Sequence, residues 1–139
     1  MTAQPKIVQD AVASTDQISR ALSQSGYNVD FSLESLKEVD RFFDEHVTSG
    51  KAKPGGLLSQ QLGARLFALG SYVGEVIRRH DGGQWQGDDN DPQGEINIAI
   101  RLRSGTILWP VQRVMKRFKN GWKTASGYIV WFYSLHIEL

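Results

Sequence analysis

The sequence predicts an α+β fold, in which N-terminal helices pack on a small antiparallel sheet of about three strands and C-terminal helices follow. Apolar residues recur at helical spacing as far as His80. After Gly82 and Gly83 the spacing changes to the alternation of a strand with one buried face. The 139 residues, 40% hydrophobic and 22% charged, suffice for one core without disulfides. We expect a disordered tail over residues 1–6 and a single domain over residues 7–139.

Three helices account for the first half of the chain. The first covers residues 7–25 and ends before a glycine. The second follows the N-cap residue Ser32 and ends near Gly50. A loop over residues 51–56, broken by Pro-Gly-Gly, separates it from the third and longest helix, over residues 57–80.

The third helix contains Gly63, Gly70 and Gly74. A glycine inside a helix costs about 1 kcal/mol relative to alanine, so another interaction should offset that cost. We expect close packing of a second helix or of the sheet on this surface. The approach of a ligand to the helix backbone is the alternative.

The second half of the chain alternates strands and turns. A short strand over residues 84–86 leads into a polar, acidic loop over 87–94. The clearest strand covers residues 95–102, because isoleucine or leucine occupies every second position. A tight turn at residues 103–105 predicts a hairpin with a partner strand over 106–109.

A short basic helix is predicted after the hairpin. Pro110 opens it and Gly121 stops it. Its apolar face is formed by Val111, Val114, Met115 and Phe118. We expect its basic residues, Arg113, Lys116, Arg117 and Lys119, to form a solvated face; phosphate contact is the alternative. The aromatic and β-branched run over residues 124–137 fits a strand or a buried helix, and Thr124 or Ser126 as a cap favours the helix.

Composition and motifs argue against most catalytic and metal-dependent chemistry. The chain has no cysteine, and its three histidines form no metal-binding pattern. The acidic loop resembles the first half of a calcium loop starting at Asp89, but the twelfth position, which needs a bidentate carboxylate, is Ile100. Neither a nucleophile elbow nor a phosphate-binding loop is present. We therefore predict a protein that is not an enzyme and that holds no cofactor or metal.

Charge and hydropathy narrow the class of partner. A net charge of +1 argues against a general nucleic-acid binder, and no apolar stretch approaches the roughly 20 residues that span a bilayer. We therefore expect a cytoplasmic protein without nucleic-acid or membrane partners. The charges are segregated, since residues 81–95 contain five acids and no Lys or Arg, whereas 96–137 contain seven basic residues and no acid. Such blocks form solvated faces or patches that face different partners.

Two sequence blocks carry a resemblance. The first is Tyr72-x-Gly74-Glu75-Val76-Ile77-Arg78-Arg79 followed by Gly82-Gly83-x-Trp85. The second is Pro110-x-x-x-Val114-x-Lys116-Arg117-x-x-x-Gly121. Together they resemble a family of small uncharacterised bacterial domains, and more loosely the immunity proteins that accompany interbacterial toxins. The resemblance implies fold signatures and a protein partner, a cognate toxin, rather than catalytic residues.

These observations give two sets of candidate residues. The residues expected to bind the toxin lie in and before the acidic loop: Trp85, Gln86, Asp88, Asp89 and Asp91. The alternative is a small-molecule-binding or regulatory domain with a pocket between the glycine-bearing helix and the sheet, near Tyr72, Glu75, Arg79 and Trp109. We expect Glu75 to pair with Arg79 one helical turn later, either as a structural ion pair or in partner recognition. The oligomeric state stays open.

Overall fold

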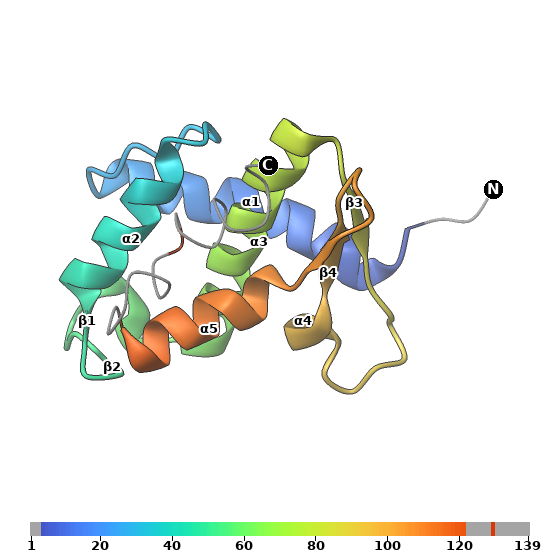
Figure 1. Ribbon diagram of the computed structural model, residues 1–139. Coiled ribbons are helices and arrows are strands. Elements are labelled where there is room, and N and C mark those ends of the chain that lie inside the picture. Colours follow the sequence, from blue (N-terminus) through green and yellow to red (C-terminus); the bar gives the residue numbers. More distant parts are fainter. Residues whose placement is uncertain (1–3, 122–128, 130–139) are drawn as a thin grey trace.

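The computed structural model describes residues 4–121 and Ile129, and within them it has an α+β fold, as predicted (Figure 1). The helices are α1 (Lys6–Gln24), α2 (Ser35–His46), the short 3-10 helix η1 (Leu57–Ser59), α3 (Leu62–Asp81), α4 (Gly94–Asn97) and α5 (Pro110–Asn120). The strands are β1 (Val47–Thr48), β2 (Lys51–Ala52), β3 (Gln84–Gln86), β4 (Ala99–Arg101) and β5 (Ile107–Leu108). The predicted segment 124–137 lies outside the described residues except for Ile129.

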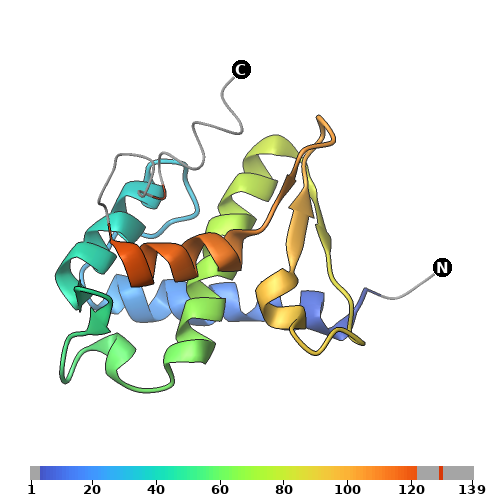
Figure 2. The ribbon, with the colours of Figure 1, turned by 60° about the horizontal axis from the view of Figure 1, so that its bottom comes forward.

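Helix α3 is the central element, and its main contacts are with α1 and α5. Figure 2 shows α3 crossing both of these helices, with α2 at one end of the molecule and the β3-β4-β5 sheet at the other. The larger core cluster combines residues of α1, α2, α3 and the sheet, among them Leu22, Phe42, Leu69 and Ile100. A smaller cluster joins the start of α1 to α3 and α5, and Trp85 packs against both clusters.

Two of the three glycines in α3 lie where helices and sheet pack closely. A Cβ atom added to Gly70 would lie 2.6 Å from the Cα of Val111 in α5. A Cβ atom at Gly74 would lie 2.5 Å from Cη2 of Trp85 and 2.9 Å from Cγ of Pro110. The expected close packing is therefore confirmed at these two positions. At Gly63 nothing lies within 4 Å, so packing does not account for that glycine.

The three-stranded sheet has the order β3-β4-β5, and both pairings are antiparallel. The predicted strand over residues 95–102 is wrong in its first half, because residues Gly94–Asn97 form α4. The N–H groups of Ile96 and Asn97 both donate to the Gln93 carbonyl, and the Asn97 side chain donates to Asp91. Because the N–H groups of Ile96 and Asn97 already have these local acceptors, they do not pair with a neighbouring strand.

The second helix is shorter than predicted, and part of the predicted loop over 51–56 forms a hairpin. Helix α2 ends at His46, and β1 pairs with β2 through a turn at Ser49 and Gly50. Both turn residues have positive φ, 51° and 73°, as a two-residue hairpin turn requires. The sequence alone does not separate a helix stop from a hairpin turn at Gly50, because a glycine with positive φ fits either role.

Two other predicted boundaries also move. Helix α3 starts at Leu62, because Gln61 adopts a left-handed conformation after the 3-10 turn. Helix α1 starts at Lys6 with Pro5 as its N-cap. The last two residues of the predicted tail over residues 1–6 therefore form the N-terminus of this helix.

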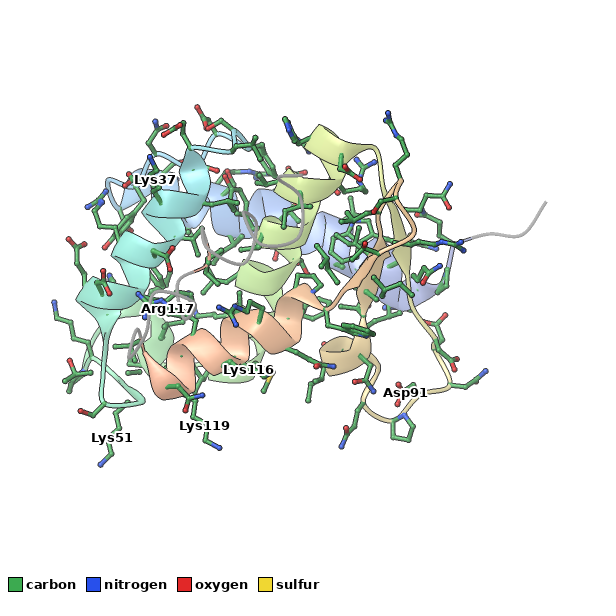
Figure 3. The ribbon with its side chains drawn as sticks, viewed as in Figure 1. Lys37, Lys51, Asp91, Lys116, Arg117 and Lys119 are labelled. Carbon is green, nitrogen blue, oxygen red and sulfur yellow. The ribbon has the colours of Figure 1, made fainter. Side chains whose placement is uncertain are left out.

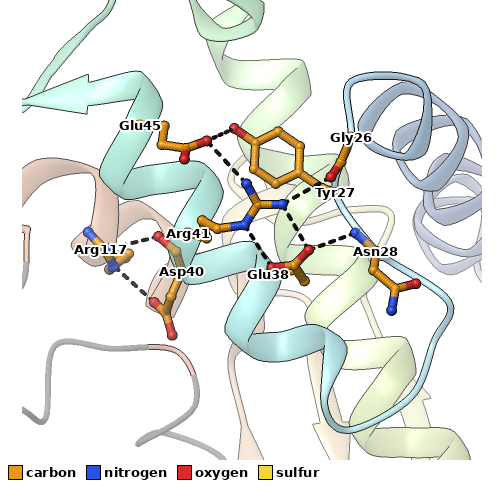
Figure 4. A network of polar contacts seen from close by, with 8 residues as sticks. All are labelled: Gly26, Tyr27, Asn28, Glu38, Asp40, Arg41, Glu45 and Arg117. Carbon is orange, nitrogen blue, oxygen red and sulfur yellow. Dashed lines mark hydrogen bonds and ion pairs between the residues drawn. The ribbon is translucent and has the colours of Figure 1, made fainter.

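An arginine of α2 fixes the connector between α1 and α2 (Figure 4). The Arg41 guanidinium donates to both carboxylate oxygens of Glu38 and to the carbonyl of Gly26. It also lies over the ring of Tyr27, 4.3 Å from the centroid, while the Tyr27 hydroxyl donates to Glu45. These contacts of Arg41 hold the connector residues Gly26 and Tyr27 against α2.

Candidate functional site

The predicted Glu75–Arg79 pair forms, but it is part of a larger cluster at the end of α3. The Glu75 side chain is only 4% exposed and accepts hydrogen bonds from Arg78 at 2.7 Å, Arg79 at 2.9 Å and the Trp85 indole at 3.0 Å. Burial alone would raise the pKa of Glu75, but the hydrogen bonds from Arg78, Trp85 and Arg79 outweigh it and lower the pKa to about 2. The charged Glu75 carboxylate thus links the end of α3 to Trp85 of β3, so Glu75 has a structural role.

Of the two further pocket candidates on α3, Tyr72 is packed among other side chains of the protein, whereas Arg79 is exposed. Tyr72 is fully buried; its hydroxyl donates to Ser35 at 2.7 Å and accepts from the Phe31 N–H at 2.9 Å. The guanidinium of Arg79 lies 4.0 Å from the centroid of the Phe31 ring. Trp109, by contrast, is 45% exposed and faces a hollow on the sheet. The structure therefore does not bring Tyr72, Glu75, Arg79 and Trp109 together around one cavity.

The acidic loop over residues 87–94 is held in one conformation by its own carboxylates. Asp88 accepts from the N–H of Asn90, and Asp91 accepts from the N–H of Gln93 and from the side chain of Asn97. The hydrogen bonds from Asn97 and from the Gln93 backbone lower the pKa of Asp91. Asp91 is therefore ionised at neutral pH. Because its own hydrogen bonds already hold the loop, a partner does not need to order it.

Asp89 has a different role from its neighbours. Its two carboxylate oxygens accept from the N–H groups of Lys6 and Ile7, each at 2.8 Å, at the start of α1. These hydrogen bonds, from Ile7 first and then Lys6, lower the pKa of Asp89. A carboxylate stabilises a helix N-terminus, where the first N–H groups have no partner within the helix. Asp89 therefore anchors the loop to α1, a long-range contact that the sequence did not reveal.

Trp85 does not have the exposed position that we expected for a partner contact. Its ring packs on Gly74 and its indole N–H donates to Glu75, so the side chain is half-buried and structural. The exposed tryptophan of this region is Trp109.

The sheet register explains how Trp109 meets the acidic loop. Trp85, Ile100 and Leu108 are paired across the three strands and form the inner face. Their neighbours along each strand point outwards. Gln84, Arg101 and Ile107 form one cross-strand row on that outer face, and Gln86 and Ala99 form the next row, beside Trp109.

The outer face contains a hollow of about 310 Å³ between the sheet and the acidic loop. Its apolar wall is formed by Ala99, Ile107 and Trp109, of which Ile107 is 40% exposed. Its acidic wall is formed by Asp88 and Asp91. Gln86, Asp88 and Asp91 from the first predicted set thus meet Trp109 from the second set at one site, which we call the sheet hollow.

A second hollow, of about 450 Å³, lies on the other side of the loop, against the start of α1. It shares Asp88 and Asp91 with the sheet hollow and adds Asp89, Lys6 and Asp10. Lys6 is paired with Asp10 at 2.9 Å, so its positive charge is already compensated by the protein.

The basic helix α5 differs from its predicted solvated face at two residues, because Arg113 is half-buried and Arg117 is buried. Arg117 has a side chain only 2% exposed, and it donates to Asp40 at 3.0 Å and to Asp44 at 2.7 Å. Figure 3 shows Lys116 and Lys119 on the outer side of α5, while Arg117 points towards α2. Figure 4 shows Arg117 beside Asp40 of α2. Asp40 also accepts from the N–H of Ile129, so this ionic contact joins α2, α5 and a residue near the C-terminus. The signal in the sequence was the pair of aspartates four residues apart on α2.

The described residues contain neither a membrane-spanning helix nor a metal-binding cluster. No described helix is both long and apolar enough to cross a membrane. Among residues 4–121 and Ile129, no group of three or more His, Cys, Asp or Glu side chains is arranged to hold a metal ion.

The chain matches no family model, no curated protein and no solved structure. The resemblance to the uncharacterised bacterial domains and to immunity proteins therefore stays a prediction. The site itself combines an exposed aromatic ring, an apolar wall and fixed carboxylates, a set of groups suited to binding a basic or mixed basic and apolar surface.

Proposed function

We propose that this protein is an immunity-type protein that neutralises a cognate bacterial toxin by direct contact in the cytoplasm. The observation that carries the proposal is the sheet hollow, in which the exposed Trp109 faces the preorganised acidic loop. Tryptophan is enriched among the residues that dominate binding energy at protein interfaces. Its position beside carboxylates favours a partner with a positively charged surface, such as the active site of a toxin that acts on nucleic acid or another anionic substrate.

Electrostatics and rigidity support this proposal. The loop residues Asp88, Asp89 and Asp91 and the nearby Glu95 give this end of the sheet a local negative charge although the whole chain is close to neutral. Opposite charges on two proteins accelerate their association, an advantage for an inhibitor that must reach a toxin quickly. Because the loop is already held by its own hydrogen bonds, little conformational entropy is lost on binding.

The test is co-expression of the protein with the product of the adjacent gene, scored by cell growth and by co-elution of the two purified proteins. We expect protection and a stable complex. Trp109→Ala should weaken the complex by at least about 2 kcal/mol, or roughly 30-fold in Kd, as for a central interface residue. A matched control is Met115→Ala, since Met115 is another exposed apolar side chain, 36% exposed, outside the sheet hollow.

Three results would argue against the proposal. If neither a complex nor protection is seen, the product of the adjacent gene is not the partner. If that gene encodes a toxin-like protein, the same result excludes the proposed function. An unchanged Kd for Trp109→Ala would exclude the sheet hollow as the contact. An equal loss for Met115→Ala would point to a general effect of surface substitution instead of a defined interface.

The second candidate function is a small-molecule-binding or regulatory domain without catalysis. The hollow of about 450 Å³ beside α1 favours it, because its volume falls within the range of ligand pockets. A thermal-shift screen with metabolites tests this function: a ligand at 100 times its Kd should add about 2.7 kcal/mol to the free energy of unfolding. A screen without a stabilising metabolite would count against it.

A further inference from the structure

The sheet hollow has a polarity that limits what can occupy it. In one direction along the strands lies the row of Gln84, Arg101 and Ile107, which carries a positive charge. In the other direction lie Asp88 and Asp91, beyond the row that contains Ala99. The aromatic ring of Trp109 lies at the acidic end, since it follows Leu108 and lines the hollow with the two aspartates. A cation is therefore favoured at the Trp109 end and repelled at the Arg101 end.

The carboxylates have remaining hydrogen-bonding capacity. Asp88 uses Oδ1 for the N–H of Asn90, and no partner for its Oδ2 is recorded among the described residues. Asp91 has one hydrogen bond on each oxygen, which fixes its orientation and leaves further lone pairs for a donor. Asp89 is different, because its carboxylate binds the start of α1 and lines the hollow beside α1, not the sheet hollow.

The size of the hollow suits a single long side chain. The hollow has a volume of about 310 Å³ and is open to solvent. One long side chain that projects from a partner surface therefore fits into it.

We infer that the sheet hollow receives an arginine side chain of the partner protein, with its guanidinium stacked on Trp109 and hydrogen-bonded to Asp88 and Asp91. The inference rests on the proposed function and deepens it, because it names the group by which the partner is recognised. A guanidinium is planar, stacks on aromatic rings and presents a fork of donors that matches carboxylates. An ammonium group meets the charge requirement but lacks the planar stacking surface, so lysine binds more weakly.

The experiment uses the whole protein and three short peptides that differ only at one residue. The probes are acetyl-Gly-Gly-Xaa-Gly-Gly-amide, where Xaa is arginine, lysine or citrulline, the last being a neutral analogue close in shape to arginine. Two-dimensional NMR follows the indole N–H of Trp109 and the backbone N–H groups of Lys6, Ile7 and residues 86–97 other than Pro92. We expect saturable shifts with the arginine peptide, at least about 3-fold weaker binding of the lysine peptide and no binding of the citrulline peptide.

A pair of double variants separates local recognition from net charge. Asp88→Asn with Asp91→Asn removes both charges, and asparagine retains the side-chain turns within the loop. Asp16→Asn with Glu34→Gln removes the same charge from exposed positions on the helical side of the molecule. We expect the first pair to weaken binding of the arginine peptide at least about 5-fold and the second to change it less than about 2-fold.

Several outcomes would overturn the inference. Equal binding of the citrulline peptide would show that charge is not recognised, and equal binding of the lysine peptide would exclude guanidinium specificity. Shifts confined to Lys6 and Ile7 would place the cation in the hollow beside α1. The failure of the inference is also distinguishable from that of the proposed function. A toxin complex without arginine-peptide binding overturns only the inference, whereas arginine-peptide binding without toxin neutralisation overturns only the proposed function.

Discussion

The same substitution, glycine to alanine, should have opposite effects at two positions of α3. At Gly63 an added Cβ meets nothing within 4 Å, and the residue lies in the first turn of the helix. At Gly70 the added Cβ would lie 2.6 Å from the Cα of Val111 and 3.0 Å from its backbone nitrogen. Those atoms belong to the backbone of α5 and cannot rotate away.

The magnitudes follow from these distances. Gly63→Ala should stabilise the protein by about 0.5 kcal/mol, since alanine loses less backbone entropy in a helix. Gly70→Ala gains the same propensity, but α3 and α5 must separate until the contact relaxes from 2.6 Å towards the 3.4 Å of an ordinary one. Overpacking of this kind costs about 1–3 kcal/mol. We therefore expect a difference of about 1–3 kcal/mol between the two variants.

Urea denaturation followed by circular dichroism measures both free energies of unfolding. The m-value serves as a check that each variant still unfolds in one cooperative step. Equal free energies for Gly63→Ala and Gly70→Ala would refute the close approach of α3 and α5. A stabilised Gly70→Ala variant would mean that the propensity gain exceeds the packing cost at this contact.

Three further predictions concern charged groups. Arg117→Ala removes one partner of a buried ion pair with Asp40 and should cost about 3–5 kcal/mol in urea denaturation. The exposed control Lys116→Ala should stay within about 0.5 kcal/mol, and equal effects of the two substitutions would exclude the buried contact. Glu75 has a pKa of about 2 in the folded protein against an ordinary 4.5, so its carboxylate stabilises the fold above pH 4.5 and this contribution disappears as the pH falls towards 2. Glu75→Gln should therefore flatten the pH dependence of the free energy of unfolding between pH 4.5 and 2, and an unchanged profile would contradict the role assigned to Glu75. Asp89→Ala should lower the free energy of unfolding by about 1 kcal/mol and accelerate hydrogen exchange in the first turn of α1, because the N–H groups of Lys6 and Ile7 lose their acceptor. Unchanged exchange in that turn would exclude the capping role of Asp89.

The candidate site was predictable only in part. The sequence predicts both the acidic loop and Trp109 as candidates, but it places them in two different sites. Only the strand register shows that Trp109 and the loop bound the same hollow. Trp85 was interpreted as exposed, because alternation within a three-residue strand does not reveal which face is covered by a helix.

The buried ion pair shows a different limit of the sequence. Arg117 lies among basic residues of an amphipathic helix, where a solvated face is the usual interpretation. Its partners Asp40 and Asp44 lie more than 70 residues earlier in the chain, and nothing local connects them. Such a pair forms because α2 and α5 meet in the folded protein, and that meeting depends on the apolar surfaces of both helices and not on the charges themselves.

The sequence by itself determined the α+β class, the main helices, the hairpin and its turn, and the need for close packing at Gly70 and Gly74 of α3. These features depend on periodicity and on the conformational limits of individual residues, which are local properties of the chain. Tertiary structure decided which charges are buried, where the acidic loop is anchored and which side chains share the sheet hollow. Those features depend on contacts between residues distant in sequence, and they exist only once hydrophobic burial has brought the helices and the sheet together.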